Sequence, residues 1–219
     1  DQIDIAHYIR PAGGDFAVGD ALPAGRITPA RQSLLAAMNI AVVPVRRKPR
    51  VALISTGDEL VVPGDAPGRS QIVSSNIYGV ASILRRQGAE PRILPIARDS
   101  AESLTTALSL AEGCDLIVTL GGASVGDHDV VAQVLGGAMS FNKVRMRPGK
   151  PLMAGRRAGQ MIVGLPGNPV SALVCAHVFL RPLIDAGAAL YCNQIEGEAL
   201  TGHSAPEDAA RALCKLGAS

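Results

Sequence analysis

Short apolar runs alternate with segments of helical periodicity through residues 50–184, and this alternation restricts the possible folds more than any other feature. Continuous apolar runs of this length are typical of strands that are covered on both faces. We therefore expect strands at "VALIS" (51–55), "RILPIA" (92–97), "DLIVTL" (115–120), "PLMAG" (151–155) and "MIVGL" (161–165). The alternation predicts an α/β fold with a parallel or mixed sheet between helix layers.

The helices expected between these strands have recognisable apolar faces and ends. In "NIYGVASILRRQG" (76–88), apolar residues recur at helical spacing, at Ile77, Val80, Ala81 and Leu84. Ser100 is the expected N-cap of a helix that ends at Gly113. Two further helices are predicted at "DVVAQVL" (129–135) and from Pro169 to about Ile184.

The predicted α/β domain, residues 49–186, has a segment of different character on each side. Residues 1–28 carry Gly and Pro punctuation every few residues, which favours short β segments joined by turns. Thr28 and Pro29 should then open a helix that stops at Asn39, followed by a short strand at "IAVVPV". We predict a small β-rich segment at 1–48 and a polar C-terminal tail at 187–219. Because the sequence opens on Asp, we expect it to be part of a longer protein.

Composition argues against several functional classes. The 219 residues carry a net charge of +2 with three Tyr and three Phe, so we expect no nucleic-acid partner. No apolar run reaches the roughly 18 residues that a membrane helix needs, so we expect no membrane partner either. The four cysteines are scattered without a C-x-x-C pair, which favours reduced thiols in a cytoplasmic protein.

Unusual polar residues gather in four strand-ending turns. In sheets of this type, ligands bind at the carboxyl ends of the strands. The turns are "STGDEL" (55–60), "LGGASVGDHD" (120–129), "RPGKP" (147–151) and "LPGNPVS" (165–171).

Two of these turns have the chemistry of anion sites. In "LPGNPVS", Gly167 permits close backbone approach, Asn168 can cap, Pro169 suits the first helical position and Ser171 adds a hydroxyl. An ordinary capped turn is the simpler alternative. "RPGKP" holds two cations on a short rigid loop, which suits phosphate, although surface salt bridges would also explain them.

Carboxylates follow the first and third strands, at Asp58, Glu59, Asp127 and Asp129. Capping of helix starts explains one or two of them. Acids beside two anion-binding turns would repel a phosphate unless a cation lies between them, and Mg²⁺ binds one or two carboxylates together with phosphate oxygens. The sequence lacks the P-loop, G-x-G-x-x-G and H-E-x-x-H patterns, which disfavours the commoner nucleotide and zinc sites.

A serine hydrolase is the main rival interpretation of the glycine-rich turn. Gly122, Ser124 and Gly126 match the G-x-S-x-G nucleophile elbow. The acid and histidine of a triad would then be Asp185 and His203. No H-G-G-G oxyanion motif is found in the sequence.

In order and spacing, the four turns closely resemble those of the molybdopterin molybdenumtransferase family, which includes the E domain of gephyrin. The similarity runs over about residues 10–184. It implies a three-layer α/β/α molybdopterin-binding domain with a mostly parallel mixed sheet. It further implies a cytoplasmic homodimer that cleaves adenylylated molybdopterin with Mg²⁺ and inserts molybdenum from molybdate. A molybdopterin adenylyltransferase would be a further partner.

The resemblance also assigns residues. The implied catalytic residues are Asp58, Glu59, Asp129 and Lys150, of which the three acids are also the metal ligands. The implied pterin-binding residues are Thr56, Gly57, Asn76, Gly121, Gly122, Ser124, Gly126, Arg147, Pro148, Gly149, Pro166, Gly167, Asn168, Pro169 and Ser171.

The chain departs from the family pattern at several positions. Ser74 stands where the family has Asp, Leu120 where it has Ser or Thr, and Val130 where Tyr is common. The family's P-x-x-x-S-x-M-D-G motif and its second domain are missing from this sequence. We therefore expect this chain to bind molybdopterin and to insert molybdenum poorly. A relative that binds the pterin without turnover is the alternative within the family.

Overall fold

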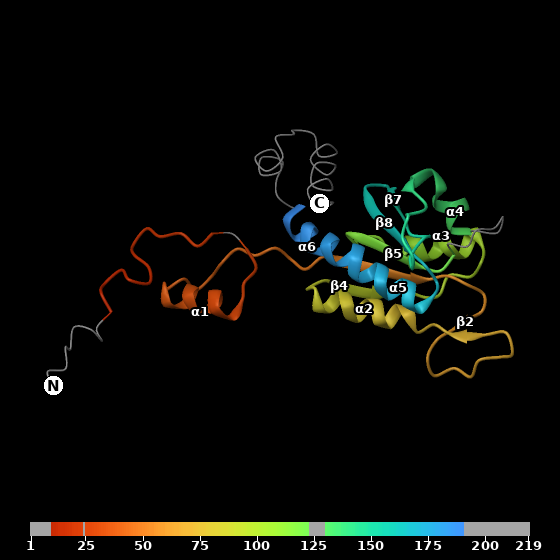
Figure 1. Cartoon of the computed structure of the whole chain (residues 1–219), viewed down its shortest axis with the longest axis horizontal. Coiled ribbons are helices and arrows are strands. Elements are labelled where there is room, and N and C mark those ends of the chain that lie inside the picture. The colour runs from red at the N-terminus through yellow and green to blue at the C-terminus, as the bar shows by residue number, and fades with distance from the viewer. Residues whose placement is uncertain (1–9, 24, 123–129, 191–219) are drawn as a thin grey trace. The chain divides into compact units, whose positions relative to one another are not determined.

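The computed structural model describes residues 10–23, 25–122 and 130–190 (Figure 1). Contacts between residues divide the chain into two compact units, Asp1–Arg46 and Arg47–Ser219. The division falls two residues before the boundary expected at residue 48.

Among its described residues, 10–23 and 25–46, the first unit contains one helix, α1 (Pro29–Ala37). As expected, the Thr28 hydroxyl accepts a hydrogen bond from the Arg31 N–H at 3.3 Å, and the chain leaves the helix through Asn39 at φ +61°. The predicted β segments are not found in the described residues: apart from α1, residues 10–23 and 25–46 form turns and coil and contain no strand, and residues 1–9 lie outside the described part. Short strands need partners in a packed sheet, and nothing in these residues offers one.

The second unit is built on a mixed sheet with the strand order β4-β1-β5-β8-β7-β6. β4, β1, β5 and β8 are parallel, whereas β7 runs antiparallel to β8 and β6 antiparallel to β7. The mostly parallel sheet is thus confirmed. The strands are β1 (Arg50–Ser55), β4 (Glu90–Ile93), β5 (Leu116–Leu120), β6 (Met139–Phe141), β7 (Met153–Arg157) and β8 (Gln160–Leu165).

Helices cover both faces of the sheet, which confirms the three layers (Figure 1). β1 shows how the sequence specifies this arrangement, because Val51 and Leu53 enter one apolar core while Ala52 and Ile54 enter the other. The first core is covered by α2 (Asn76–Arg86), α5 (Pro169–Cys175), the π-helical turn Ala176–Leu180 and α6 (Arg181–Leu190). The second is covered by α3 (Ala101–Ser109) and α4 (Val130–Leu135).

Three details of the second unit differ from the sequence-based expectation. The long final helix contains the π-helical turn because Pro182 has no N–H to donate to the carbonyl four residues earlier. β4 begins two residues earlier than predicted and ends at Ile93, so that Ala97 pairs only through a single bridge to Thr56. A small parallel pair, β2 (Leu60–Val61) and β3 (Ile72–Val73), was not predicted, and neither was β6.

Candidate functional site

The sheet topology brings the four predicted turns to one edge. β1, β5 and β8 are parallel neighbours, so the turns that follow them lie side by side. "RPGKP" precedes β7 instead of following a strand. Because β7 is antiparallel to β8, with Met153 opposite Gly164, the start of β7 lies beside the end of β8. The same edge therefore receives three of the turns and the described start of the fourth, residues 120–122.

The turns after β1 and β5 are in direct contact. The Thr56 N–H donates to the Leu120 carbonyl at 3.0 Å, and the Gly121 N–H donates to the Leu165 carbonyl at 3.1 Å. Gly121 has φ +94°, and a Cβ at this residue would lie 2.7 Å from the Thr56 carbonyl oxygen. A Cβ at Gly122, with φ +65°, would lie 2.8 Å from the Thr56 hydroxyl. The glycine pair is therefore required for this close packing.

The turn after β8 joins the same cluster. A Cβ on Gly167 would lie 3.4 Å from the Gly121 Cα, and the Asn76 amide donates to the Gly167 carbonyl at 2.6 Å. Asn168 is the N-cap of α5, as predicted, and its side-chain oxygen accepts hydrogen bonds from the Ser171 N–H and hydroxyl at 3.1 and 3.3 Å. Pro166 is buried, and Pro169 is the first residue of α5.

The acidic turn after β1 exposes two carboxylates, Asp58 and Glu59. Gly57 is buried at φ +145°, and the Glu59 side chain folds back so that its Oε2 occupies the region where a Cβ of Gly57 would lie. Within the residues that the structure describes, no group of three or more His, Cys, Asp or Glu could hold a metal ion. The third predicted ligand, Asp129, falls outside those residues, as do Ser124, Gly126 and Asp127. Two carboxylates still suit Mg²⁺, which takes its other ligands from water and phosphate.

The loop between β4 and α3 also lies at this edge, although the sequence did not predict it as part of the site. One nitrogen of Arg98, Nη1, lies 3.0 Å from the carbonyl oxygens of both Asp58 and Leu60. Asp58 and Asp99 exchange two hydrogen bonds, in which each backbone N–H donates to the carboxylate of the other residue, at 3.0 and 3.3 Å. β4 is parallel to β1 and next to it, so the rule that located the other turns would have located this loop too.

"RPGKP" is fixed by its backbone, while its two cations point into solvent. The Arg147–Pro148 peptide is cis, and Gly149 is buried at φ +119°, where a Cβ would lie 2.7 Å from the Cys175 sulfur of α5. The Lys150 carbonyl accepts from the Val144 N–H at 3.0 Å. Arg147 and Lys150 are exposed, and neither forms an ion pair with any described residue. The salt-bridge alternative for these cations therefore finds no support in the described residues.

Ser74, one of the departures noted in the sequence, is 7% exposed. Its hydroxyl is 2.9 Å from the hydroxyl of Ser55, which is also buried. Leu120 is buried as well, at the end of β5. Neither residue therefore presents a polar group to solvent at this edge.

The position of Asp185 does not suit the hydrolase interpretation. Asp185 lies in α6, in a helical run that starts at Pro169, 16 residues earlier. At 1.5 Å per residue, Asp185 is roughly 24 Å further along the helix axis than the start of α5 at the site edge. Asp185 therefore lies far from the described part of that edge, which disfavours it as the acid of a triad built there. Ser124 and His203 lie outside the described residues.

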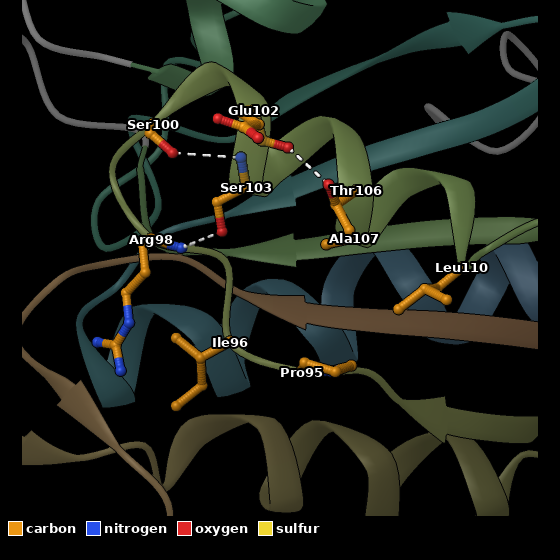
Figure 2. A pocket seen from close by; sticks show the side chains of 9 residues that line it. All are labelled: Pro95, Ile96, Arg98, Ser100, Glu102, Ser103, Thr106, Ala107 and Leu110. Carbon is orange, nitrogen blue, oxygen red and sulfur yellow. Dashed lines mark hydrogen bonds between the residues drawn. The ribbon is translucent and has the colours of Figure 1, made fainter.

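A pocket of about 400 Å³ opens beside the β4–α3 loop, against the first turns of α3 (Figure 2). Its hydroxyl groups already have partners. Ser100 accepts from the Ser103 N–H, Ser103 accepts from the Arg98 N–H, and Thr106 donates to the Glu102 carbonyl. The hydroxyl groups of the pocket are therefore already engaged, whereas the sheet edge presents exposed charges of both signs.

No helix in the described part of the chain is long and apolar enough to cross a membrane. The family model for a probable molybdopterin binding domain matches residues 52–186. A molybdopterin molybdenumtransferase of Nostoc sp. is 40% identical in an alignment of 171 positions that covers 74% of this chain and 39% of the relative. Molybdopterin molybdenumtransferase 2 of Mycobacterium tuberculosis is 42% identical in an alignment of 186 positions that covers 80% of this chain and 46% of the relative.

A solved structure of a related protein shares the fold. The crystal structure of a molybdopterin biosynthesis moea protein from Pyrococcus horikosii superposes with a TM-score of 0.68 at 33% identity, over 75% of this chain and 42% of that protein. This chain thus spans less than half the length of these relatives. The resemblance that the four turns indicated is confirmed, and the chain belongs to the molybdopterin-binding domain family.

Proposed function

We propose that this chain is the molybdopterin-binding part of a molybdopterin molybdenumtransferase. The reaction is Mg²⁺-dependent cleavage of adenylylated molybdopterin, coupled to insertion of molybdenum from molybdate. One observation carries the proposal: backbone hydrogen bonds and glycine contacts hold turns from β1, β5 and β8 together at one sheet edge, and the "RPGKP" turn enters at the same edge. Two exposed carboxylates and two exposed cations thereby reach one surface.

The cationic and the acidic side chains have different proposed roles. Arg147 and Lys150 attract the phosphate of the pterin and the molybdate anion, because neither cation is neutralised by a described partner. Asp58, Glu59 and Asp129 hold Mg²⁺, which when bound neutralises charge on the phosphoanhydride.

The uncharged turn residues hold the pterin and exclude water. The residues proposed for this role are Thr56, Gly57, Asn76, Gly121, Gly122, Ser124, Gly126, Pro148, Gly149, Pro166, Gly167, Asn168, Pro169 and Ser171. Cleavage then depends on positioning and electrostatics, without a covalent intermediate on the protein.

By analogy with its longer relatives, we propose that the full reaction also uses a second copy of the protein and regions that those relatives have outside the matched part. Covering the site in this way would exclude water and lower the local dielectric. A molybdopterin adenylyltransferase would supply the substrate in the cytoplasm.

Binding without turnover is the second candidate, and Ser74 favours it. The family has a carboxylate here, whereas Ser74 is buried and bonded to Ser55. The site then has one acid fewer for Mg²⁺.

The decisive assay is AMP release from adenylylated molybdopterin in the presence of Mg²⁺ and molybdate. We expect this chain to bind the pterin and to release AMP slowly, and the same chain completed with the remaining regions of a full-length relative to release it faster. Binding without AMP release from either form would establish the second candidate. Labelling of Ser124 by a fluorophosphonate would instead support a hydrolase.

A further inference from the structure

The acidic turn, residues 57–60, forms hydrogen bonds with the β4–α3 loop beyond the point where β4 ends. Ala97 accepts from the Gly57 N–H at 3.0 Å and donates to the Ser55 carbonyl at 2.9 Å. The next residue of the turn, Asp58, exchanges two hydrogen bonds with Asp99 of the loop. The loop 97–99 therefore supports the acidic turn from the side as an extra strand would.

Arg98 lies at the centre of this contact. Its Nη1 is 3.0 Å from the carbonyl oxygens of Asp58 and Leu60 and 3.5 Å from that of Gly57. The turn's own closing bond, from the Leu60 N–H to the Gly57 carbonyl, is long at 3.4 Å. Hydrogen bonds from a charged donor are about twice as strong as those between neutral groups. The guanidinium is thus a charged donor shared by the carbonyls of Gly57, Asp58 and Leu60, while the Glu59 carbonyl between them accepts from the Ile72 N–H at 2.8 Å.

The backbone of Arg98 is itself anchored. Its N–H donates to the Ser103 hydroxyl at 2.9 Å, in the first turn of α3 (Figure 2). Ser100 caps the same turn by accepting from the Ser103 N–H at 3.2 Å. The neighbouring Ala97 is 1% exposed. A continuous set of contacts therefore runs from α3 through Arg98 to the acidic turn.

We propose that Arg98 is a positioning residue: by holding the carbonyls of Gly57, Asp58 and Leu60 it sets where the Asp58 and Glu59 carboxylates lie, without contacting the ligand. The role of those carboxylates in Mg²⁺ binding rests on the proposed function. Without the guanidinium, the turn samples other conformations and the acids lose their fixed spacing. The pterin-binding turns after β5 and β8 keep their own hydrogen bonds, so pterin affinity should persist.

Three variants test this role. Arg98→Gln removes the charge, and Arg98→Lys keeps a donor cation of different geometry. Arg86→Gln removes the same charge from an exposed arginine in the last turn of α2 and serves as the matched control. For each protein we would measure hydrogen exchange of the 57–61 amides without ligand, Mn²⁺ affinity by EPR with molybdopterin bound, and molybdopterin affinity.

In Arg98→Gln we expect faster exchange at 57–61 and a loss of Mn²⁺ affinity of roughly 10–100-fold, as is typical when a group that orients metal ligands is removed. Molybdopterin affinity should stay within about twofold, Arg98→Lys should recover part of the Mn²⁺ affinity, and Arg86→Gln should match the wild type. Unchanged exchange and unchanged Mn²⁺ affinity in Arg98→Gln would overturn the proposal. So would equal losses of pterin and Mn²⁺ binding, since these would indicate direct ligand contact. The exchange measurement needs no ligand, so it still tests Arg98 if the wild-type chain fails to release AMP and the proposed function falls.

Discussion

Replacing Gly121 by alanine should destabilise the fold and weaken pterin binding together. The residue has φ +94°, where a Cβ costs about 1–2 kcal/mol. The new methyl group would lie 2.7 Å from the Thr56 carbonyl oxygen, which belongs to a hydrogen-bonded backbone and moves little. Overpacking of this kind adds about 1–3 kcal/mol, so the total loss is about 2–5 kcal/mol.

Gly113→Ala is the matched control. Gly113 has φ +77°, but nothing lies within 4 Å of its Cβ position. The control therefore carries only the backbone strain. In both variants alanine also restricts the unfolded chain, which offsets about 0.4–1 kcal/mol of the loss, so the two should differ by the overpacking of about 1–3 kcal/mol. Urea unfolding measures both losses, and fluorescence titration measures molybdopterin affinity. Equal stability losses in the two variants, or unchanged pterin affinity in Gly121→Ala, would refute the close packing of the β1 and β5 turns as the basis of the site.

Three further predictions concern charge and burial. Lys150→Ala should weaken molybdopterin binding and reduce its salt dependence, and an unchanged affinity at low salt would make Lys150 a simple surface charge. Asp115→Ala should cost about 1–3 kcal/mol in urea unfolding, because Asp115 accepts two 2.6 Å hydrogen bonds from Arg47 and one from the Arg50 N–H; a loss below about 0.5 kcal/mol would contradict this. Burial raises the pKa of the Cys175 thiol, so the folded state keeps a proton that the unfolded chain releases. The stability from this group is complete below the ordinary thiol pKa and is lost as pH rises above it. Cys175→Ala should therefore show a shallower fall of stability at alkaline pH than the wild type, and identical slopes would argue against it.

The sequence predicted those elements whose signal is local. The buried face of α2 follows directly from the spacing of Ile77, Val80, Ala81 and Leu84, and Ser100 caps α3 as expected. The glycine and proline punctuation of the first unit predicted β segments wrongly, because such residues mark turns but do not supply the strand partners that a sheet needs.

The site was predictable as a set of turns but not as a set of contacts. The rule that ligands bind where parallel strands end located three turns, and "RPGKP" reaches the same edge because β7 is antiparallel. Arg98 could not be recognised, since its partners are backbone carbonyls about 40 residues earlier, which leave no pattern in the sequence. Ser74 was noted as a departure, but its bond to Ser55 depends on packing between segments 19 residues apart.

The most direct test of the account is hydrogen exchange of this chain with and without molybdopterin. We predict slower exchange in the peptides that cover the four turns, at residues 56–60, 121–122, 147–150 and 166–171, because these are the backbone groups at the proposed binding edge. The pocket beside α3, residues 95–110, should keep its exchange rate apart from the contacts at 97–99. Protection centred on that pocket, or saturable pterin binding with no protection at the four turns, would contradict the assignment of the site to this edge of the sheet.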